Sequence, residues 1–437
     1  MAGLTLAIML EKAGIRYVLV DKTPSAQPLG GGLFLSPQVM RVFDQLGILP
    51  ELDEIGTRGP QLKYFTQDGK EVACVVPGHL ENFGYHAYFF ARVDLVEVLL
   101  RHIPKDKVLW GKKVLSTMQN ENGVMVRFSD NSSLDGDILI GADGAYSAVR
   151  QSLYRNLKKK GVSVPASDTG MLHFQEFCIL GVTDYIGDKY PIVNSTDQYL
   201  SIVLGSKDKP YNLAYAPTKG GRLCWRIAGK LIENQIVDEA SFRFSDWASE
   251  SIQDIVTEIE RVPIAIGGTV GNLLENTPSV SRVMLEACHK TLPAAGQGAI
   301  QAILDAVVLA NLMYELPSTS VKDLGCMFAT YFEIRGDVTR KVVETSKKLG
   351  KMASGKSTLD LWFRNVIIKL VSSTFVQNRL SKKMAGRPVL NYLPEPPLRG
   401  NMPDTFPTMT LTQKDKNEKS EATDSKSKSS ENNAVAA

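Results

Sequence analysis

Hydrophobic positions along the first third of the chain alternate between helical and strand spacing. Apolar residues recur at helical spacing over Gly3–Ala13, and Ile15–Asp21 follows as a short apolar run typical of a strand buried on both faces. Helices are also predicted in "SPQVMRVFDQLGIL" and "RVDLVEVLLRHI", whereas "QLKYFTQDGKEVACVV" alternates around an Asp-Gly pair and predicts a β-hairpin. The stretch "VMVRFSDNSSLDGDILIGADG" predicts a strand, a turn over Asn131–Gly136 and an apolar strand, and a helix begins in "SAVRQSLY".

The middle of the chain has a different pattern. Short alternating strands between about residues 165 and 270 predict a mostly antiparallel sheet, followed by a helix over Phe242–Glu260. After Ser279 the β-α pattern returns with "VML" and two long helices. Helical spacing continues over Ser357–Met384, a Pro-rich stretch follows, and the polar tail cannot bury enough surface to order itself. The predicted fold class is therefore α/β, with an inserted antiparallel sheet and a helical C-terminal region.

Composition narrows the function classes. The chain has 437 residues, of which 43 % are apolar and 22 % charged, and its net charge of +3 is too small to predict a nucleic-acid partner. Five scattered cysteines and five dispersed histidines predict reduced thiols in an intracellular protein and no metal site. The apolar start lacks a preceding basic region, and no run reaches the roughly 20 apolar residues that span a bilayer. We expect neither a secretory signal nor a membrane span.

The segment "AGLTLAIMLEKAGIRYVLVDK" matches the second half of a dinucleotide-binding β-α-β unit. Such a unit carries G-x-G-x-x-G at its first turn, so that the backbone can approach a pyrophosphate, and an acid about twenty residues further on that binds ribose hydroxyls. Gly3 stands in the place of the third glycine and Asp21 in the place of the acid. The first strand and first two glycines are missing here, and we expect relatives to carry them.

Two further segments complete a pattern. "DILIGADGAYSAVR" is an apolar strand ending in Gly-Ala-Asp-Gly before a helix, and "ACHKTLPAAGQGAIQAILDAVVLANLMYEL" has a glycine-rich turn that opens a long helix. In this order and around an inserted sheet, the three segments resemble the aromatic-hydroxylase superfamily of single-component FAD-dependent monooxygenases, of the fungal type. The resemblance covers about residues 1–350.

The resemblance implies a set of cofactor-binding residues. Gly3 and Asp21 match the ADP-ribose end of the FAD site, Gly32 a backbone contact, and Arg92 the arginine that reaches the pyrophosphate. The Asp-Gly motif that serves FAD and the nicotinamide cofactor is implied at Asp143 and Gly144. The loop over the isoalloxazine ring is implied at Pro293, Gly296, Gln297, Gly298 and Ala299. Free N–H groups at a helix N-terminus would stabilise the negative charge of a reduced flavin.

One departure from the family pattern concerns the strand before the third motif. The family has Gly-Asp where this chain has Leu285 and Glu286. Either Glu286 replaces the aspartate, or a segment carrying Gly-Asp is absent between Glu286 and Ala287; we favour the absence.

The resemblance also implies the domain order. We expect an FAD-binding domain that begins without its first strand, a substrate domain with the antiparallel sheet, a second part of the FAD-binding domain, a helical Pro-rich region and a disordered tail. Their bounds are 1–160, 161–275, 276–350, 351–408 and 409–437.

The implied activity is that of an oxidoreductase. NAD(P)H reduces FAD, and one atom of O2 passes to a small lipophilic or aromatic substrate by hydroxylation or epoxidation, as in secondary metabolism; no catalytic side chain is required. Two alternatives stay open: a degenerate, non-catalytic relative with impaired FAD binding, and a flavoprotein reductase of the same fold. The basic and apolar residues 361–383 could contact a membrane surface or pack on the FAD domain, so the expected location is cytoplasmic or peripherally membrane-associated.

Overall fold

The fold is described from a computed structural model. It describes residues 1–27, 29–76, 80–144, 147–164, 176–194, 199–206, 211–230, 256–257, 259–264, 267–281, 283–286, 296–353, 358–383, 386–397, 400–404 and 406. None of the helices in these ranges is long and apolar enough to cross a membrane.

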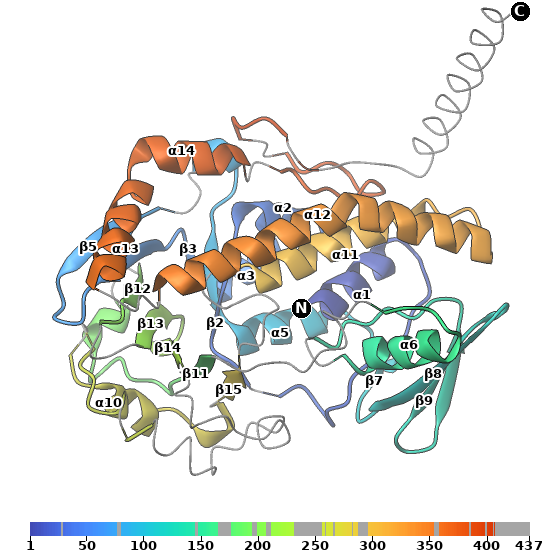
Figure 1. Cartoon of the computed structure of the whole chain (residues 1–437), viewed down its shortest axis with the longest axis horizontal. Helices are drawn as coiled ribbons and strands as arrows, with labels where there is room; N and C mark the ends of the chain where they lie inside the picture. The colour runs from blue at the N-terminus through green and yellow to red at the C-terminus, as the bar shows by residue number, and fades with distance from the viewer. Residues whose placement is uncertain are drawn as a thin grey trace, which may run out of the picture.

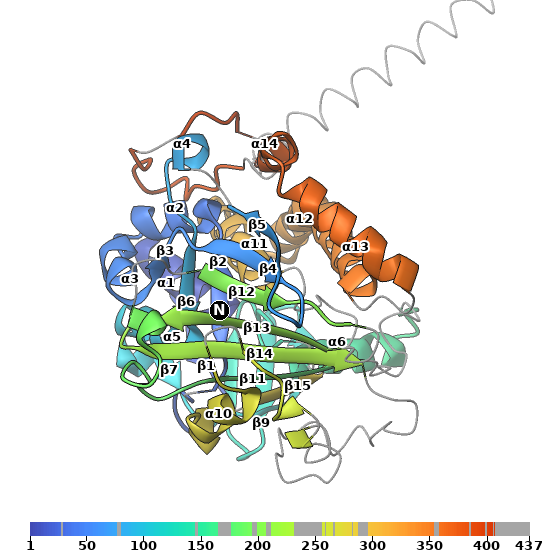
Figure 2. The same ribbon diagram turned by 90° about the vertical axis from the view of Figure 1, so that its left-hand side faces the viewer.

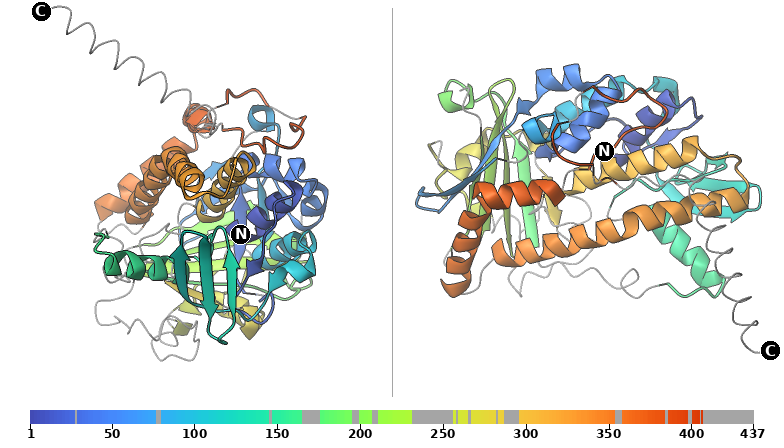
Figure 3. Two further views of the ribbon diagram at one scale, coloured as in Figure 1. Left: turned by 90° about the vertical axis from the view of Figure 1, so that its right-hand side faces the viewer. Right: turned by 90° about the horizontal axis from the view of Figure 1, so that it is seen from above.

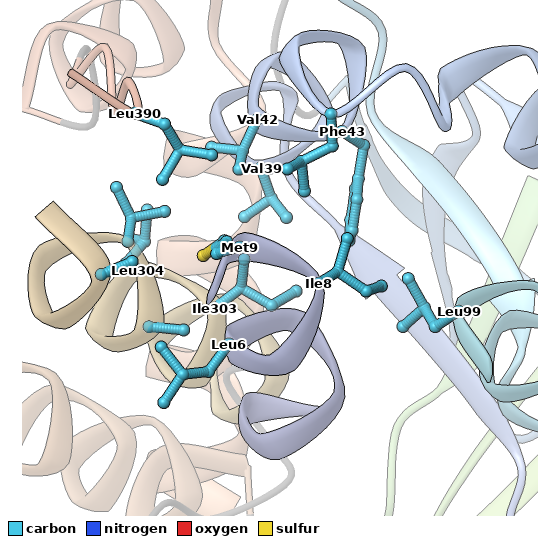
Figure 4. Packing of buried hydrophobic residues seen from close by; sticks show 14 of the residues in the cluster. Leu6, Ile8, Met9, Val39, Val42, Phe43, Leu99, Ile303, Leu304 and Leu390 are labelled. Carbon is cyan, nitrogen blue, oxygen red and sulfur yellow. The ribbon is translucent and has the colours of Figure 1, made fainter. Parts of the chain in front are cut away.

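The largest core is made of helices that come from opposite ends of the chain (Figure 1). Helix α1 packs along α11, and Figure 4 shows Leu6 and Met9 of α1 beside Ile303 and Leu304 of α11. All residues of α1 from Thr5 to Leu10 are buried, and α11 is buried on most of its sides, so both helices lie inside the core. The helices around this core are α1 (Ala2–Lys12), α2 (Pro37–Gln45), α3 (Leu49–Ile55), α4 (Leu80–Phe83), α5 (Arg92–Arg101) and α11 (Gly298–Tyr314).

A seven-stranded sheet forms the second part of the molecule (Figure 2). Its order is β15-β11-β14-β13-β12-β4-β5, antiparallel throughout except for the parallel pair β12 and β4. Its aromatic inner face packs against α10 (Val270–Glu275), with Tyr211, Tyr215 and Trp225 buried there as core residues. The strands are β4 (Gln61–Phe65), β5 (Glu71–Val75), β11 (Glu176–Val182), β12 (Tyr199–Val203), β13 (Tyr211–Thr218), β14 (Arg222–Lys230) and β15 (Val283–Glu286).

Three smaller sheets connect these parts. Their orders are β2-β6-β3, β10-β9-β8 with α6 packed against β8, and the parallel pair β1-β7. The strands are β1 (Leu19–Val20), β2 (Gly32–Leu35), β3 (Thr57–Arg58), β6 (Tyr88–Ala91), β7 (Val108–Leu109), β8 (Val114–Asn120), β9 (Gly123–Phe128) and β10 (Ser133–Gly136). Helix α6 is Ala148–Lys159, and short 3-10 turns lie at Lys105–Lys107, Pro191–Asn194 and Ser279–Ser281.

Three helices and an extended segment complete the chain (Figure 3). Helix α12 (Val321–Ala353) lies along α11, and α13 (Thr358–Val371) and α14 (Thr374–Lys383) follow at the end of the molecule occupied by the large sheet. The segment after α14 returns to the core, where the hydroxyl of Tyr392 donates to the carbonyl of Met9 at 2.9 Å. The C-terminal region therefore closes over α1 and α11.

Most predicted elements are confirmed, including the helices α1, α2, α5, α6, α11 and α12, the hairpin β4-β5 and the antiparallel sheet. The predicted helix over Phe242–Glu260 falls almost wholly outside the described residues. The bounds of the domains stay predictions, and strands of the large sheet come from all three of the first predicted ranges.

Two strand predictions are wrong, and a third strand lies in another sheet than expected. The run Ile15–Asp21 contains only the two-residue strand β1. It is not buried on both faces, because Arg16 and Val18 are exposed to solvent. The chain pairs over Ser133–Gly136, inside the predicted turn, and the apolar stretch that follows it packs on the core through Ile138 and Ile140 without joining a sheet. The strand predicted at "VML" is present as β15, but it joins the large sheet, where it pairs antiparallel with β11.

Candidate cofactor site

The first two motifs meet at the start of α1. A Cβ built on Gly3 would lie 3.4 Å from Cβ of Ala142 and 3.5 Å from Cδ1 of Leu19. A methyl group would make ordinary van der Waals contact with both neighbours. The first turn of α1 thus packs closely on the Gly-Ala-Asp-Gly segment, and close packing is the role of the third glycine in a dinucleotide-binding turn.

Asp21 follows β1 at the edge of the β1-β7 pair. Its backbone N–H donates to the carbonyl of Leu109 at 3.0 Å, which holds the residue in place. The backbone N–H and the hydroxyl of Thr23 both donate to Oδ1 of Asp21, at 2.8 and 2.7 Å. The carboxylate is exposed and oriented, as an acceptor for ribose hydroxyls has to be.

Arg92 is the first residue of α5, and its side chain lies against the glycine-rich segment that leads into β2. Its backbone N–H donates to the carbonyl of Gly31 at 2.9 Å, and Nη1 donates to the carbonyl of Leu29 at 2.6 Å. Gly30 has φ +117°, and a Cβ there would lie 2.8 Å from Cδ of Arg92, so this position needs glycine. Burial lowers the pKa of Arg92, and the Asp21 carboxylate is close enough to oppose that shift. A half-buried cation thus lies near the predicted ribose acceptor.

Gly32 lies opposite Ala91 in the β2-β6 pair. A Cβ on Gly32 would lie 2.0 Å from Cζ of Phe89, inside the ring's van der Waals radius. Its neighbour Gly31 approaches the large sheet, where a Cβ would lie 3.4 Å from Cβ of Leu180. The glycines of "LGGGLF" therefore let this segment approach Arg92, Leu180 of the large sheet and Phe89 of β6. The sequence motif predicted only the cofactor contact at Gly32.

Asp143 has a structural partner in addition to its predicted role. Its Oδ2 accepts from the backbone N–H groups of Ala148 at 2.7 Å and Val149 at 3.3 Å, which caps the N-terminus of α6. Gly144 has φ +79°, a left-handed conformation that glycine adopts without strain. Both residues are exposed. The structure thus explains Asp-Gly as a helix cap, and the binding of FAD or a nicotinamide cofactor there stays a prediction.

The third motif supplies the N-terminus of α11. Gly296 has φ +60°, Gln297 is the N-cap residue, and the helix starts at Gly298. Ala299 packs against the core beside α1. The first N–H groups of α11 have no intrahelical acceptor and carry the positive end of the helix dipole, so they can stabilise an anionic ring. Pro293 lies outside the described residues.

A buried arginine that the sequence reading missed supports this helix end. Arg335 of α12 is 2 % exposed; its Nε donates to Oδ1 of Asp305 and its Nη2 donates to Oε1 of Gln301, both at 2.6 Å. The amide of Gln301 in turn donates to Oε1 of Gln297 at 3.2 Å. Gln297, Gln301 and Asp305 are spaced by four along a mostly apolar helix, and this spacing indicates one polar stripe. Only the fold shows that Arg335 lies opposite this stripe.

The structure thus brings together Gly3 with the Asp-Gly segment, and Arg92 with Asp21 and Gly32, while α1 packs along α11. Glu286 lies elsewhere, as the last residue of β15 opposite Phe177 in the large sheet. Whether it replaces the family aspartate stays a prediction. Among the described residues, no group of His, Cys, Asp or Glu side chains could hold a metal ion.

Comparisons with known proteins agree with this geometry. The family model described as FAD binding domain matches residues 1–179. The FAD-dependent monooxygenase ausM of Emericella nidulans is 26 % identical over 428 residues, which cover 91 % of this chain and 86 % of that protein. The FAD-dependent monooxygenase ausM of Aspergillus calidoustus is 28 % identical, and the aligned part covers 91 % of this chain and 88 % of that protein. Residues 1–179 thus match the FAD binding domain family, and the chain as a whole is similar to fungal FAD-dependent monooxygenases.

Solved structures of such enzymes share the fold. HpxO of Klebsiella pneumoniae, complexed with FAD and uric acid, aligns with a TM-score of 0.64 at 18 % identity and covers 87 % of this chain and 93 % of that one. The p-nitrophenol 4-monooxygenase PnpA of Pseudomonas putida also aligns with a TM-score of 0.64, at 17 % identity, over 88 % and 94 % of the two chains. These likenesses show a mixed α/β fold with an antiparallel sheet and C-terminal helices.

The residues described above fit FAD as the cofactor. Gly3 leaves room for a close approach, Asp21 offers a carboxylate acceptor, and Arg92 offers a cation for the pyrophosphate. The N-terminus of α11 offers N–H donors for the flavin ring. This donor set matches the chemistry of the two ends of FAD.

Proposed function

We propose that this enzyme uses NAD(P)H and O2 to hydroxylate or epoxidise a small lipophilic or aromatic substrate in secondary metabolism. The packing of α1 against α11 carries the proposal, because it supports an ADP-ribose site and a flavin-ring site with one rigid core. The relatives named ausM, FAD-dependent monooxygenases of fungi, support the reaction class.

The chain's own residues bind and orient in this mechanism. Arg92 and Asp21 would hold the phosphate and ribose end of FAD, and the N–H groups at the start of α11 would stabilise negative charge on its ring. FAD, once bound and reduced, supplies the activation of O2. The Arg335 network fixes the polar stripe of α11, so that the helix end keeps its position when charge develops.

An apolar layer between the sheets supports a lipophilic or aromatic substrate. Phe89 and Ala91 of β6 are buried against Val182, Ala216 and Cys224 of the large sheet. Burial raises the pKa of Cys224 to about 12, so its thiol stays protonated and is no nucleophile. A site next to this layer would exclude water from the reaction.

The test begins with the visible absorption spectrum of the purified chain after incubation with FAD and desalting. We expect a flavin spectrum at near-equal stoichiometry; a colourless protein would indicate a relative with impaired FAD binding. Candidate aromatic and isoprenoid substrates are then incubated with NADH or NADPH under isotope-labelled O2. Label in the product supports the proposal, whereas NAD(P)H oxidation without incorporation into any of them indicates a reductase.

A further inference from the structure

Helix α13 is attached to the protein through a buried arginine. Arg364 is 5 % exposed, and its Nη1 donates to the carbonyl of Gly205 at 2.8 Å, just beyond β12. The same helix packs against β5 at the edge of the large sheet. An arginine thus anchors the side of α13 that faces the protein body.

The outer side of α13 and the start of α14 is apolar. Trp362 is 60 % exposed, and its ring lies edge-on to that of Phe363 with centroids 5.1 Å apart. Phe375 of α14 is 75 % exposed. We call this surface the aromatic face, and its members are Trp362, Phe363, Ile367, Leu370 and Phe375. Monomeric proteins seldom leave such a set of large apolar side chains together in water.

Cations surround the aromatic face. Lys369, Arg379 and Lys382 are exposed on the same two helices. The sequence from Leu361 to Lys383 contains no Asp or Glu. In Figure 2, α13 and α14 lie at the periphery, where nothing among the drawn elements lies outside them.

We propose that the aromatic face docks on the surface of an anionic lipid bilayer. Trp and Phe side chains enter the boundary between headgroups and acyl chains, and flanking Lys and Arg bind anionic headgroups. Charge decides between a bilayer and a second copy of this chain, since two such faces would oppose cation to cation, whereas anionic lipid complements them. This surface lies on α13 and α14, apart from the cofactor site, and it does not depend on which substrate the enzyme uses.

The test is flotation of the full chain with vesicles of phosphatidylcholine, with and without phosphatidylserine. We expect binding to the anionic vesicles that falls with added salt. Trp362→Ala/Phe363→Ala should weaken binding by at least about tenfold, because two large apolar anchors are lost. Lys369→Glu should weaken it by more than about fivefold, because one cation near the surface is replaced by an anion.

Matched controls lie on α6, at the far end of the molecule in Figure 1, where Leu153 and Lys158 are exposed. Leu153→Ala and Lys158→Glu should bind vesicles as the unaltered chain does. Trp362→Phe should still bind, yet lose most of the quenching of tryptophan fluorescence by brominated lipids. The proposal is overturned if the chain stays with the aqueous fraction, or if the α13 and α6 variants bind alike. It is also overturned if the chain forms dimers that Trp362→Ala/Phe363→Ala dissociates, because the face then joins two copies.

Discussion

Helices α11 and α13 are both rich in apolar residues but bury very different shares of them. In α11 most apolar residues are buried against α1 and the rest of the core, and its polar residues Gln301 and Asp305 face Arg335 of the next helix. In α13 an arginine faces the protein, and the tryptophan and phenylalanine face out. The first arrangement stabilises the cofactor core, whereas the second leaves apolar area available for a partner. Hydrophobic content alone therefore does not tell which helix supports the fold.

The largest expected effect is a cavity in the α11 core. Ile303 is fully buried, so Ile303→Ala should lower the free energy of unfolding by about 2–5 kcal/mol. Ile367→Ala on the outer side of α13 removes the same atoms from a residue that is 37 % exposed, and we expect less than about 1 kcal/mol. Urea unfolding of the two variants measures the difference. Equal losses would contradict the contrast between the two helices.

Cofactor binding should depend on the core and not on α13. Arg92→Met removes a half-buried cation beside Asp21, and we expect the Kd for FAD to rise roughly ten- to hundredfold. Titration of the apoprotein with FAD, followed by flavin fluorescence, measures it. Arg101→Met, at the exposed end of the same helix, and Trp362→Ala should leave the Kd unchanged. A normal Kd for Arg92→Met would remove that residue from the site.

The buried Arg364 should contribute to the attachment of α13. Arg364→Met leaves the carbonyl of Gly205 without this donor, so we expect a loss of about 1–2 kcal/mol and faster amide exchange across α13. Exchange measured by mass spectrometry locates the effect. Arg379→Met on the exposed side of α14 provides the control and should change neither quantity. Unchanged exchange in Arg364→Met would mean that other contacts hold the helix.

The smallest expected effect is on the polar stripe of α11. Gln301→Leu removes the acceptor for Nη2 of Arg335 but leaves Asp305 in place, so we expect a loss of about 1 kcal/mol and a rise in the Kd for FAD of about fivefold or less. Gln151→Leu on exposed α6 is the matched control. If the stability of Gln301→Leu falls while its Kd for FAD stays unchanged, the network would support the fold only.

Local features of the sequence predicted the helices well, for identifiable reasons. Glycine follows the helices α1 and α2 with φ +69° at Gly14 and +78° at Gly47, and Ser36 with Pro37 opens α2. These signals need only neighbouring residues, because helical hydrogen bonds join residues four apart. The same holds for the hairpin around Gly69, with φ +84°.

Strand partners were predicted less well. Nothing in "VML" or in "QLKYF" indicates that β15 joins β11 or that β4 lies parallel to β12. Strand pairing joins residues whose distance along the chain carries no information on their contact. Asp143 is a different case, since its sequence context predicts a cofactor contact and the structure adds a cap on α6 only five residues further on.

By itself, the sequence determined the helices, the hairpin and the antiparallel sheet, because periodicity and turn chemistry act over a few residues; the roles expected of Gly3, Asp21 and Arg92 rest on the family resemblance. The tertiary structure decided which side of each amphipathic helix is buried, and it brought Arg335 to Gln301 and Arg364 to Gly205. A helical pattern specifies two sides but not their neighbours. Only the packing of distant segments determines which side faces the core, which faces the cofactor and which is left for a partner.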